Sequence, residues 1–270
     1  MRFFSYFRAI MSFSRVYIVS TGSRTGAWNM FFDTALLRLF VEGAFQERYG
    51  RNAALWRFYT WDPAAVSLGH GQFSGEIDKK RCRQEKIDIV RRPTGGRAVL
   101  HADEFTYSFF AETLETNAAI YAMVHDVIRL ALRRLGVETE FCRSTPDMRR
   151  RYSTAESVSC FTASARNELQ AGGRKLVGSA QRRSGSALLQ HGSLPLSGNY
   201  RMLTGLLANG NPEVLSAVAD RLERKTVSLA DLTGSALSYD TLLDAMCRAI
   251  AESTCGAIRY LSEKELTALL

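Results

Sequence analysis

The residue best suited to covalent chemistry is Cys160, in the stretch SVSCFTAS. Its small, mostly hydroxyl-bearing neighbours differ from the large apolar side chains that usually surround a buried thiol. Lys175 follows fifteen positions later, directly after the turn Gly172-Gly173-Arg174. An ammonium beside a thiol lowers the pKa of the thiol and raises the fraction of nucleophilic thiolate. The two residues therefore predict nucleophilic catalysis if they meet in the fold, and a structural thiol and a solvated lysine if they do not. No cysteine–histidine–acid triad can be selected by spacing alone.

The turn Thr94-Gly95-Gly96 is a second candidate, because a glycine backbone can approach a ligand closely or surround an anion. A structural hairpin is the alternative interpretation of this turn. The chain contains neither G-x-x-x-x-G-K-S/T nor G-x-G-x-x-G. These two kinds of phosphate-binding loop are therefore not predicted.

The composition narrows the class of protein. Of 270 residues, 46% are hydrophobic and 23% are charged, which is typical of a globular chain with one large or two small domains. Five cysteines without C-x-x-C spacing and four scattered histidines predict no disulfide framework and no metal site. We therefore expect a protein of the reducing cytoplasm. No apolar run is long enough to cross a membrane, and we expect no stable membrane association.

The net charge of +8 is typical of a chain that attracts nucleic acid, an anionic membrane or an acidic protein. The positive charge recurs in four clusters, at 79–81, 91–92, 149–151 and 182–183, and a solvated surface is the alternative interpretation of any single cluster. Nucleic acid is the weaker candidate, because no recognition-helix, RRM or KH pattern is visible. We expect no nucleic-acid partner.

Periodicity predicts the elements that must position these residues. Strand patterns occur at 16–19, 55–60, 65–68, 87–90 and 187–190, and helical patterns at 29–39, 76–86, 118–135, 212–222, 228–232 and 239–252. Hairpins are expected over 91–110 and around Gly172-Gly173. Strand alternation after that second turn would put Lys175 and Ser179 on one face and Gly178 and Ala180 on the other. The pattern predicts an α/β (α+β) fold with a mixed, largely antiparallel sheet flanked by helices. We expect an N-terminal extension at 1–15 and a single catalytic domain at 16–270, with a small helical portion at about 205–270.

Four segments, taken together, resemble one superfamily. They are NMFFDTALL (29–37), WDPAAVSLGHGQ (61–72), RRPTGGRAVLHADEFTYSF (91–109) and GRKLVGSAQRRSGSALLQHGSLPL (173–196). In order and content they are similar to motifs of the lipoate–protein ligases, octanoyltransferases and biotin–protein ligases. The resemblance spans about residues 30–235 and implies a catalytic domain of the biotin/lipoate–protein ligase type.

Cys160 separates the classes within this superfamily. S-C-F at 159–161 resembles the Cys-Phe that LipM-type octanoyl-(acyl-carrier-protein):protein N-octanoyltransferases carry just before the lysine strand. The ATP-dependent lipoate–protein ligases need no cysteine and commonly use a further C-terminal domain. Another octanoyltransferase class has its nucleophile in P-C-G followed by Ile or Val. Thr254-Cys255-Gly256-Ala257 matches that motif only in part, so we interpret Cys255 as structural.

The resemblance implies acyl transfer through a thioester on Cys160, without cofactor or metal. Lys175 would hold the acyl carbonyl oxygen and lower the pKa of Cys160. The expected donor is octanoyl-acyl carrier protein, and the expected acceptor is a lipoyl domain such as glycine cleavage H protein. Residues expected to line the substrate channel are Arg92, Gly95, Gly96, Arg97, His101, Gly178, Ser179, Ala180, Gln190, His191 and Gly192. The alternatives are an ATP-dependent lipoate–protein ligase and a non-catalytic module that binds an acyl chain or carrier protein.

Overall fold

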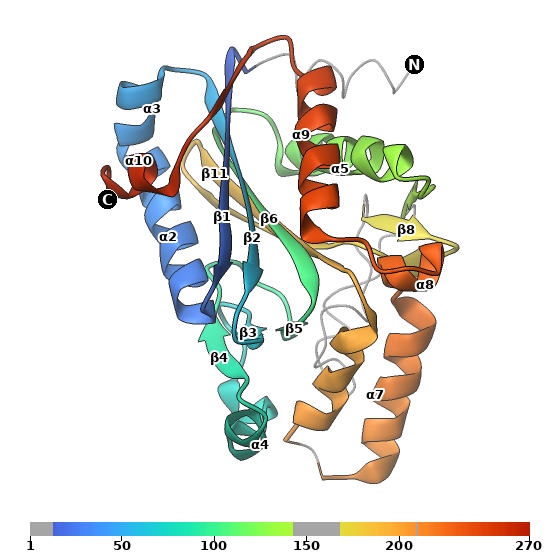
Figure 1. The fold of residues 1–270 in the computed structure, drawn as a ribbon. Helices are drawn as coiled ribbons and strands as arrows, with labels where there is room; N and C mark the ends of the chain where they lie inside the picture. The colour runs from blue at the N-terminus through green and yellow to red at the C-terminus, as the bar shows by residue number, and fades with distance from the viewer. Residues whose placement is uncertain (1–12, 143–167, 209) are drawn as a thin grey trace.

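Six strands form the central sheet, in the order β10-β11-β6-β2-β1-β12 (Figure 1). The structure is a computed structural model that describes residues 13–142, 168–208 and 210–270. The strands of this sheet are β1 (Arg15–Arg24), β2 (Ala53–Trp61), β6 (Glu104–Glu112), β10 (Gly178–Ser184), β11 (Ala187–Pro195) and β12 (Ala257–Tyr260). The pairs from β10 through β11 and β6 to β2 are antiparallel, whereas β2–β1 and β1–β12 are parallel. The predicted mixed, largely antiparallel sheet is confirmed.

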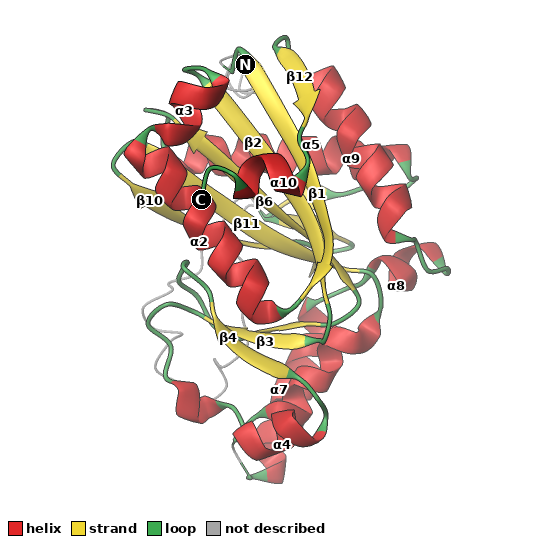
Figure 2. Ribbon diagram, turned by 60° about the vertical axis from the view of Figure 1, so that its left-hand side comes forward, coloured by secondary structure: helices red, strands yellow, loops and turns green. Residues whose placement is uncertain are grey.

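Helices cover both faces of this sheet (Figure 2). One face packs against α2 (Gly26–Glu42), α3 (Ala44–Tyr49) and α10 (Glu263–Thr267), and the other against α5 (Asn117–Arg134) and α9 (Tyr239–Ser253). Side chains alternate along each strand, so neighbours belong to different layers of the core. In β2, Leu55 belongs to the apolar layer under α2 and α3, and Trp56 to the layer under α5 and α9. Two separate apolar layers therefore fix the sheet between its helices.

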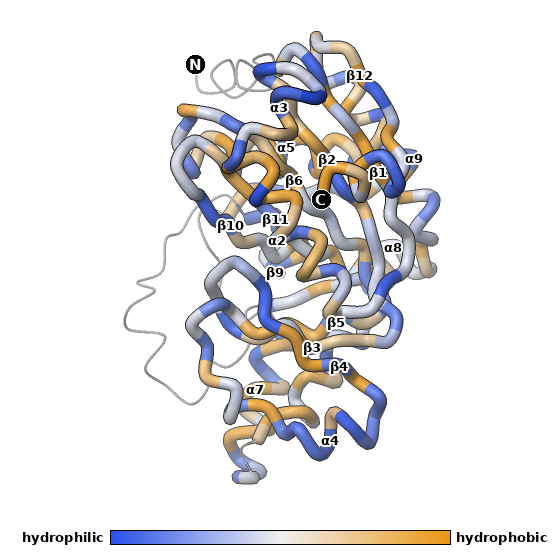
Figure 3. Tube along the Cα trace, turned by 90° about the vertical axis from the view of Figure 1, so that its left-hand side faces the viewer, coloured by the Kyte–Doolittle hydropathy of each residue, from blue (hydrophilic) through white to orange (hydrophobic). Residues whose placement is uncertain are grey.

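A smaller sheet, in the order β4-β3-β5, lies below the central one. It consists of β3 (Ala65–Leu68), β4 (Asp88–Arg91) and β5 (Val99–His101), and it packs against η4 (Gly198–Leu206) and α7 (Pro212–Lys225). Between β3 and β4 the chain forms η1 (Ser74–Glu76) and α4 (Lys79–Gln84) in place of the single helix expected over 76–86. Figure 3 contrasts the apolar β3 and the middle of β4 with the hydrophilic α4.

The prediction of a hairpin over 91–110 is wrong. β4 and β5 do not pair with each other, because β3 lies between them, parallel to β4 and antiparallel to β5. β5 then leads into β6, which belongs to the central sheet. The loop between β4 and β5 is held instead by Arg92, whose guanidinium donates to the carbonyls of Gly95 and Arg97 at 2.9 and 2.7 Å.

A third sheet is formed by β7 (Glu140–Phe141), β8 (Leu169–Ala171) and β9 (Arg174–Lys175). The hairpin expected around Gly172-Gly173 is confirmed, since β8 and β9 are antiparallel and both glycines have the positive φ that such a turn requires. The chain then leaves this sheet at 176–177 and enters the central sheet as β10. This change of sheet interrupts the alternation expected for Lys175 and the residues after it.

The region after residue 205 contains α7, α8 (Leu229–Thr233), α9 and α10 as helices, close to the expected ranges. It also contributes β12 to the central sheet, which the sequence did not predict. Of the expected N-terminal extension, only residues 13–15 lie in the described part of the chain. Within the described residues, no helix is long and apolar enough to cross a membrane.

Candidate active site

A narrow cavity lies where the central sheet, the smaller sheet and α2 meet. The space between the surrounding atoms, including the open mouth, is about 450 Å³. The lining residues are Met30, Tyr59, Trp61, Ser67, Arg92, Val99, His101, Thr106, Lys175, Gly178, Ser179, Ala180, His191, Gly192 and Ser193. Eight of these fifteen were expected to line the channel or carry out its chemistry. Strands from three sheets thus bring residues far apart in the sequence to one site.

Lys175 is buried at this cavity, with 1% of its surface exposed. Its Nζ donates to Oε1 of Glu168 at 2.8 Å, and Glu168 is itself buried. A buried ammonium requires such a counter-charge, and removing one member of a buried pair costs about 3–5 kcal/mol. The alternative interpretation of Lys175 as a solvated lysine is therefore wrong. Glu168 was not identified, because nothing in its sequence neighbourhood distinguishes it from a surface glutamate.

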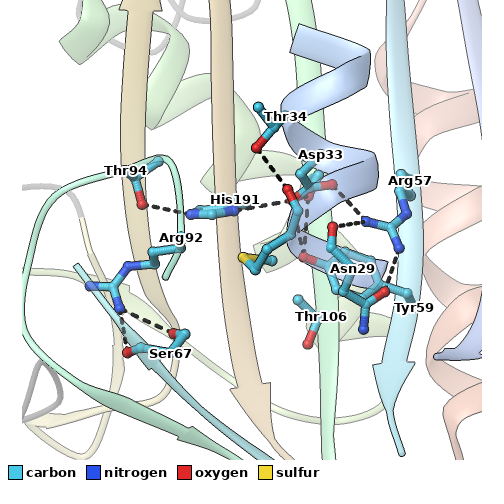
Figure 4. A network of polar contacts seen from close by, with 12 residues as sticks. Asn29, Asp33, Thr34, Arg57, Tyr59, Ser67, Arg92, Thr94, Thr106 and His191 are labelled. Carbon is cyan, nitrogen blue, oxygen red and sulfur yellow. Dashed lines mark hydrogen bonds and ion pairs between the residues drawn. The ribbon is translucent and has the colours of Figure 1, made fainter. Parts of the chain in front are cut away.

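His191, on β11, is held between two side chains from opposite directions (Figure 4). Its Nδ1 lies 3.2 Å from Oδ2 of Asp33, and its Nε2 lies 2.7 Å from Oγ1 of Thr94. Burial lowers the pKa of His191, although Asp33 opposes this shift. The ring is therefore fixed across the cavity wall rather than exposed as a mobile base.

Asp33 is the anchor of this network and is fully buried on α2. Its Oδ1 lies 2.6 Å from Nη1 of Arg57, and its Oδ2 accepts from Ser108 at 2.7 Å and from Tyr59 at 3.2 Å. Burial alone would raise the pKa of Asp33, but Arg57 and His191 bring it below the ordinary value. Asp33 lies in the 29–37 segment that supports the resemblance. Its role as an anchor was not inferred from the sequence.

Arg92 and His101 form the wall that faces the smaller sheet. Nη1 of Arg92 donates to the carbonyl and Oγ of Ser67, at 2.9 and 3.1 Å. His101 places Nε2 at 2.6 Å from Oγ of Ser67 and Nδ1 at 2.6 Å from Oε1 of Glu104. The ring of Trp61 stacks on His101 with a centroid distance of 3.9 Å. This wall is rigid, because each polar group is satisfied by a fixed neighbour.

Four of the residues expected in the channel support it from outside the lining. Gly95 and Arg97 supply the carbonyls that hold Arg92, and the Arg97 side chain pairs with Glu76 at 2.8 Å. A Cβ on Gly69 would lie 2.0 Å from the carbonyl oxygen of Gly96, so the two loops touch through glycine backbone.

Gln190 is the fourth of these supporting residues, and its side-chain amide donates to the hydroxyl of Tyr107 at 3.0 Å. The remaining candidate, Cys160, lies outside the described residues. The structure therefore brings Lys175 together with most of the expected channel but does not describe the thiol.

Gly192 allows the closest approach inside the cavity. It is paired with Ser179 on β10 and Tyr107 on β6, whose hydroxyls are 2.8 Å apart. A Cβ at position 192 would lie 2.4 Å from Oγ of Ser179 and 2.7 Å from the carbonyl oxygen of Gly178. Only glycine leaves room for this pair of hydroxyl groups.

We expect Gly192→Ala to lower both stability and activity. The added methyl must displace strand β10, and overpacking of this kind costs about 1–3 kcal/mol. Thermal unfolding and octanoyl transfer should both report the change. Gly205→Ala is the matched control, because a Cβ there meets no atom within 4 Å. Equal behaviour of the two variants would contradict the close packing at position 192.

The cavity combines an apolar wall with a buried cation. Met30, Tyr59, Trp61 and Val99 can contact an alkyl chain, while Lys175 can donate to a carbonyl oxygen or a developing oxyanion. Among the described residues, no group of three or more His, Cys, Asp and Glu side chains is arranged to hold a metal ion. The arrangement suits an acyl compound with one reacting carbonyl.

Comparison of the sequence with protein families assigns the chain to a known enzyme family. Residues 27–251 match the family model described as the lipoyl protein ligase A/B catalytic domain. The chain is 33% identical over 257 residues to octanoyltransferase LipM of Kyrpidia tusciae, covering 93% of this chain and 90% of that relative. It is 36% identical over 230 residues to octanoyltransferase LipM of Exiguobacterium sibiricum, covering 83% and 81%.

Solved structures share the fold over nearly the whole chain. A bipartite lipoate protein ligase of Thermoplasma acidophilum, from a study that includes its E2 lipoyl domain, has a TM-score of 0.71 at 20% identity, covering 95% of this chain and 90% of that one. A lipoate-protein ligase A bound with ATP has a TM-score of 0.65 at 20% identity, covering 95% and 92%. At this identity the similarity establishes the fold.

Proposed function

We propose that this chain, which belongs to the lipoyl protein ligase A/B catalytic-domain family, transfers an octanoyl group from octanoyl-acyl carrier protein to the target lysine of a lipoyl domain. The chain is an acyltransferase of lipoate biosynthesis, since the relatives that it matches over most of its length are octanoyltransferases. That similarity is the observation that carries the proposal. The apolar cavity with a buried lysine supports it.

The first half of the proposed reaction forms an acyl-enzyme. The thiolate of Cys160 attacks the octanoyl thioester, the bond to the carrier-protein sulfur breaks so that this sulfur leaves as a thiolate, and the octanoyl group becomes bonded to Sγ. Exchange of one thioester for another is nearly isoenergetic, and the later conversion to an amide is favourable, so ATP is not required. The assignment of Cys160 rests on the sequence resemblance.

The second half transfers the acyl group to nitrogen. The neutral amine of the acceptor lysine attacks the carbonyl carbon, and the C–S bond to Cys160 breaks as the amide forms. We assign Lys175 to hold the carbonyl oxygen, because a buried ammonium stabilises an oxyanion strongly. The burial of Lys175 beside the apolar wall supports this role.

The remaining cavity residues are assigned to substrate binding. The octanoyl chain would lie along Trp61 and Val99, and Gly178, Ala180 and Gly192 would leave room for it. Arg92 and His101 would fix the wall opposite Lys175 through their contacts with Ser67. Gly95, Gly96 and Arg97 would support this wall from outside, and Gln190 would hold Tyr107 on β6.

Acidic partners fit the charge of the chain. Lipoyl domains are the acceptor class, and glycine cleavage H protein is the specific acceptor that we propose. Acyl carrier proteins and lipoyl domains are typically acidic, so the net charge of +8 favours encounter with both. We place the reaction in the cytoplasm, where both partners and a reduced thiol are present.

The alternative enzyme is an ATP-dependent lipoate–protein ligase. The fold shared with the ATP-bound lipoate-protein ligase A favours it. A non-catalytic module that binds an acyl chain is the alternative from another class, and it would form no covalent product.

The proposal is tested with the wild-type protein, octanoyl-acyl carrier protein and apo H protein, without ATP. Intact-mass measurement should show an octanoyl increment first on the enzyme and then on the H protein. The control reaction contains free octanoate with ATP and should give little product. Product formed only in that control would support the ligase, and no product in either reaction would leave a binding module.

A further inference from the structure

A chain of hydrogen bonds outside the assigned chemistry ends at the Lys175 side of the cavity. It joins Gln181, Gln190, Tyr107, Ser179 and His125, with successive distances of 2.8, 3.0, 2.8 and 2.8 Å. Of these residues, Ser179 lines the cavity itself.

The donor and the acceptor of the first hydrogen bonds in this chain follow from the contacts of Gln181. The amide nitrogen of Gln181 also lies 3.0 Å from the backbone carbonyl of Asn117, which can only accept, so this atom is the nitrogen. It therefore donates to Oε1 of Gln190, and Nε2 of Gln190 donates to the hydroxyl of Tyr107. The Tyr107 oxygen thus already accepts one hydrogen bond, so its own proton can be donated to Oγ of Ser179.

This direction leaves Ser179 poised to pass on its own proton. Its Oγ accepts from Tyr107, and its hydroxyl proton can reach Nε2 of His125 at 2.8 Å. Tyr107 remains a donor, because burial raises its pKa well above the ordinary value. Ser179 can thus accept a proton from the cavity while it gives its own to His125.

The chain is connected to the group that we assign to the acyl carbonyl. The hydroxyl of Tyr121 lies 3.4 Å from the carbonyl of Ser179 and 3.5 Å from Oε1 of Glu168, which binds Lys175. Ser67 and His101 also form a hydroxyl–imidazole pair in the cavity. Their contacts, however, run to Arg92 and Glu104 on the opposite wall.

The second acyl transfer needs a base at this end of the cavity. An ordinary lysine has a pKa of about 10.4, so the acceptor arrives as an ammonium and must lose a proton before it attacks. Both ring nitrogens of His191 face Thr94 and Asp33, and the carboxylate of Glu168 pairs with Lys175. The Ser179 hydroxyl combines an imidazole partner, His125, with a connection through Tyr121 and Glu168 to Lys175.

We propose that Ser179 and His125 form a proton relay that deprotonates the acceptor lysine, an inference that rests on the proposed acyl transfer. Nζ–H of the ammonium gives its proton to Oγ of Ser179 as the serine proton moves to Nε2 of His125. The neutral amine forms the C–N bond, the C–S bond breaks, and the second N–H proton goes to the departing thiolate. The buried imidazolium then returns its proton through Ser179 to the cavity.

The pH dependence of acyl transfer depends on the titratable groups around His125. Among the described residues, Tyr121 lies one turn earlier on α5 with its ring centroid 4.4 Å from that of His125, and Tyr107 on β6 bonds to Ser179. Glu168, just before β8, lies 3.5 Å from the Tyr121 hydroxyl and pairs with Lys175 on β9. The next residue along α5, Asp126, pairs with Arg129. From α9, Leu242, Ala245, Met246, Ala249 and Ile250 are buried in the apolar layer that α5 joins, and Tyr239 and Cys247 pack against it. The imidazole is the proton acceptor among these groups that the Ser179 hydroxyl reaches directly.

The test uses Ser179→Ala and His125→Gln, which retains a hydrogen-bonding side chain but cannot take up a proton. Octanoyl-enzyme is formed first, then chased with apo H protein between pH 6.5 and 9. In both variants the transfer step at pH 7 should slow about 10²–10³-fold more than octanoyl-enzyme formation does in the same variant. Transfer by the variants should rise about tenfold per pH unit as free amine accumulates, whereas wild-type transfer should rise less steeply over the same range.

Ser67→Ala, with thermal unfolding of every variant, completes the experiment. The Ser67→Ala variant should change the rate of acyl transfer by the same factor at every pH. A constant deficit for Ser179→Ala, or a changed pH slope for Ser67→Ala alone, would overturn the relay. An octanoyl increment on Ser179 in a Cys160→Ser variant would identify a nucleophile instead. If the wild-type protein formed no octanoylated H protein, the proposed function itself would be rejected. This result differs from the outcomes that overturn the relay alone.

Discussion

Replacing Cys160 by serine is expected to abolish the octanoyl-enzyme and to reduce octanoyl transfer by about 10⁴-fold or more, the loss typical of removing a catalytic nucleophile. A serine hydroxyl at this position has neither the acidity nor the nucleophilicity of a thiol beside an ammonium. Intact mass after incubation with octanoyl-acyl carrier protein measures the first effect. The yield of octanoylated H protein measures the second.

Two other cysteines provide matched controls for this experiment. Cys255 is exposed and Cys247 is half-buried, and neither lines the cavity. Cys255→Ser and Cys247→Ser should keep both the octanoyl increment and the transfer rate. An increment that persists in Cys160→Ser and disappears in Cys255→Ser would transfer the nucleophile to the late cysteine, whose surroundings match the other octanoyltransferase motif in part.

The sequence predicts elements well where one local signal determines them. Helix α5 was expected from its apolar repeat, and Gly136 follows its end with a φ of 76°. The turn at Gly172-Gly173 was expected because two adjacent glycines can both adopt positive φ. In these cases the backbone preference and the apolar pattern agree.

The sequence is a weaker guide where distant segments decide the outcome. The 91–110 segment has the glycine turn of a hairpin, yet β3 intervenes between β4 and β5, and no local signal shows such an insertion. Strand β12 is short and mostly exposed, so it lacks an apolar alternation, and its parallel pairing with β1 is a long-range event.

The same distinction applies to the site. Lys175, Arg92, His101 and His191 were expected there, and the cavity contains all four. Their partners Glu168, Asp33 and Ser67 were not, because each is recognised only by the side chain it contacts across the fold. Identity of a reactive residue can be inferred from a motif, whereas its protonation and orientation depend on neighbours that the motif does not contain.

Lys175→Met is expected to lower the rate of octanoyl transfer by about 10²–10³-fold, the loss typical of removing an oxyanion-stabilising donor. It should also lower stability by about 3–5 kcal/mol, because the substitution breaks a buried ion pair by removing one of its members. Activity loss in this variant alone would therefore combine catalysis with packing. Thermal unfolding and single-turnover transfer must be measured together.

The double variant Lys175→Met with Glu168→Gln separates the two effects. Neutralising both members of a buried ion pair also removes the carboxylate charge that lost its ammonium, so most of the lost stability should return. Transfer should stay slow, because the missing ammonium can no longer donate to the carbonyl oxygen as its negative charge develops. Recovery of transfer together with stability would show that Lys175 serves only to balance Glu168. A double variant that is stable, forms little octanoyl-enzyme and transfers it slowly would place the ammonium at the reacting carbonyl in both half-reactions.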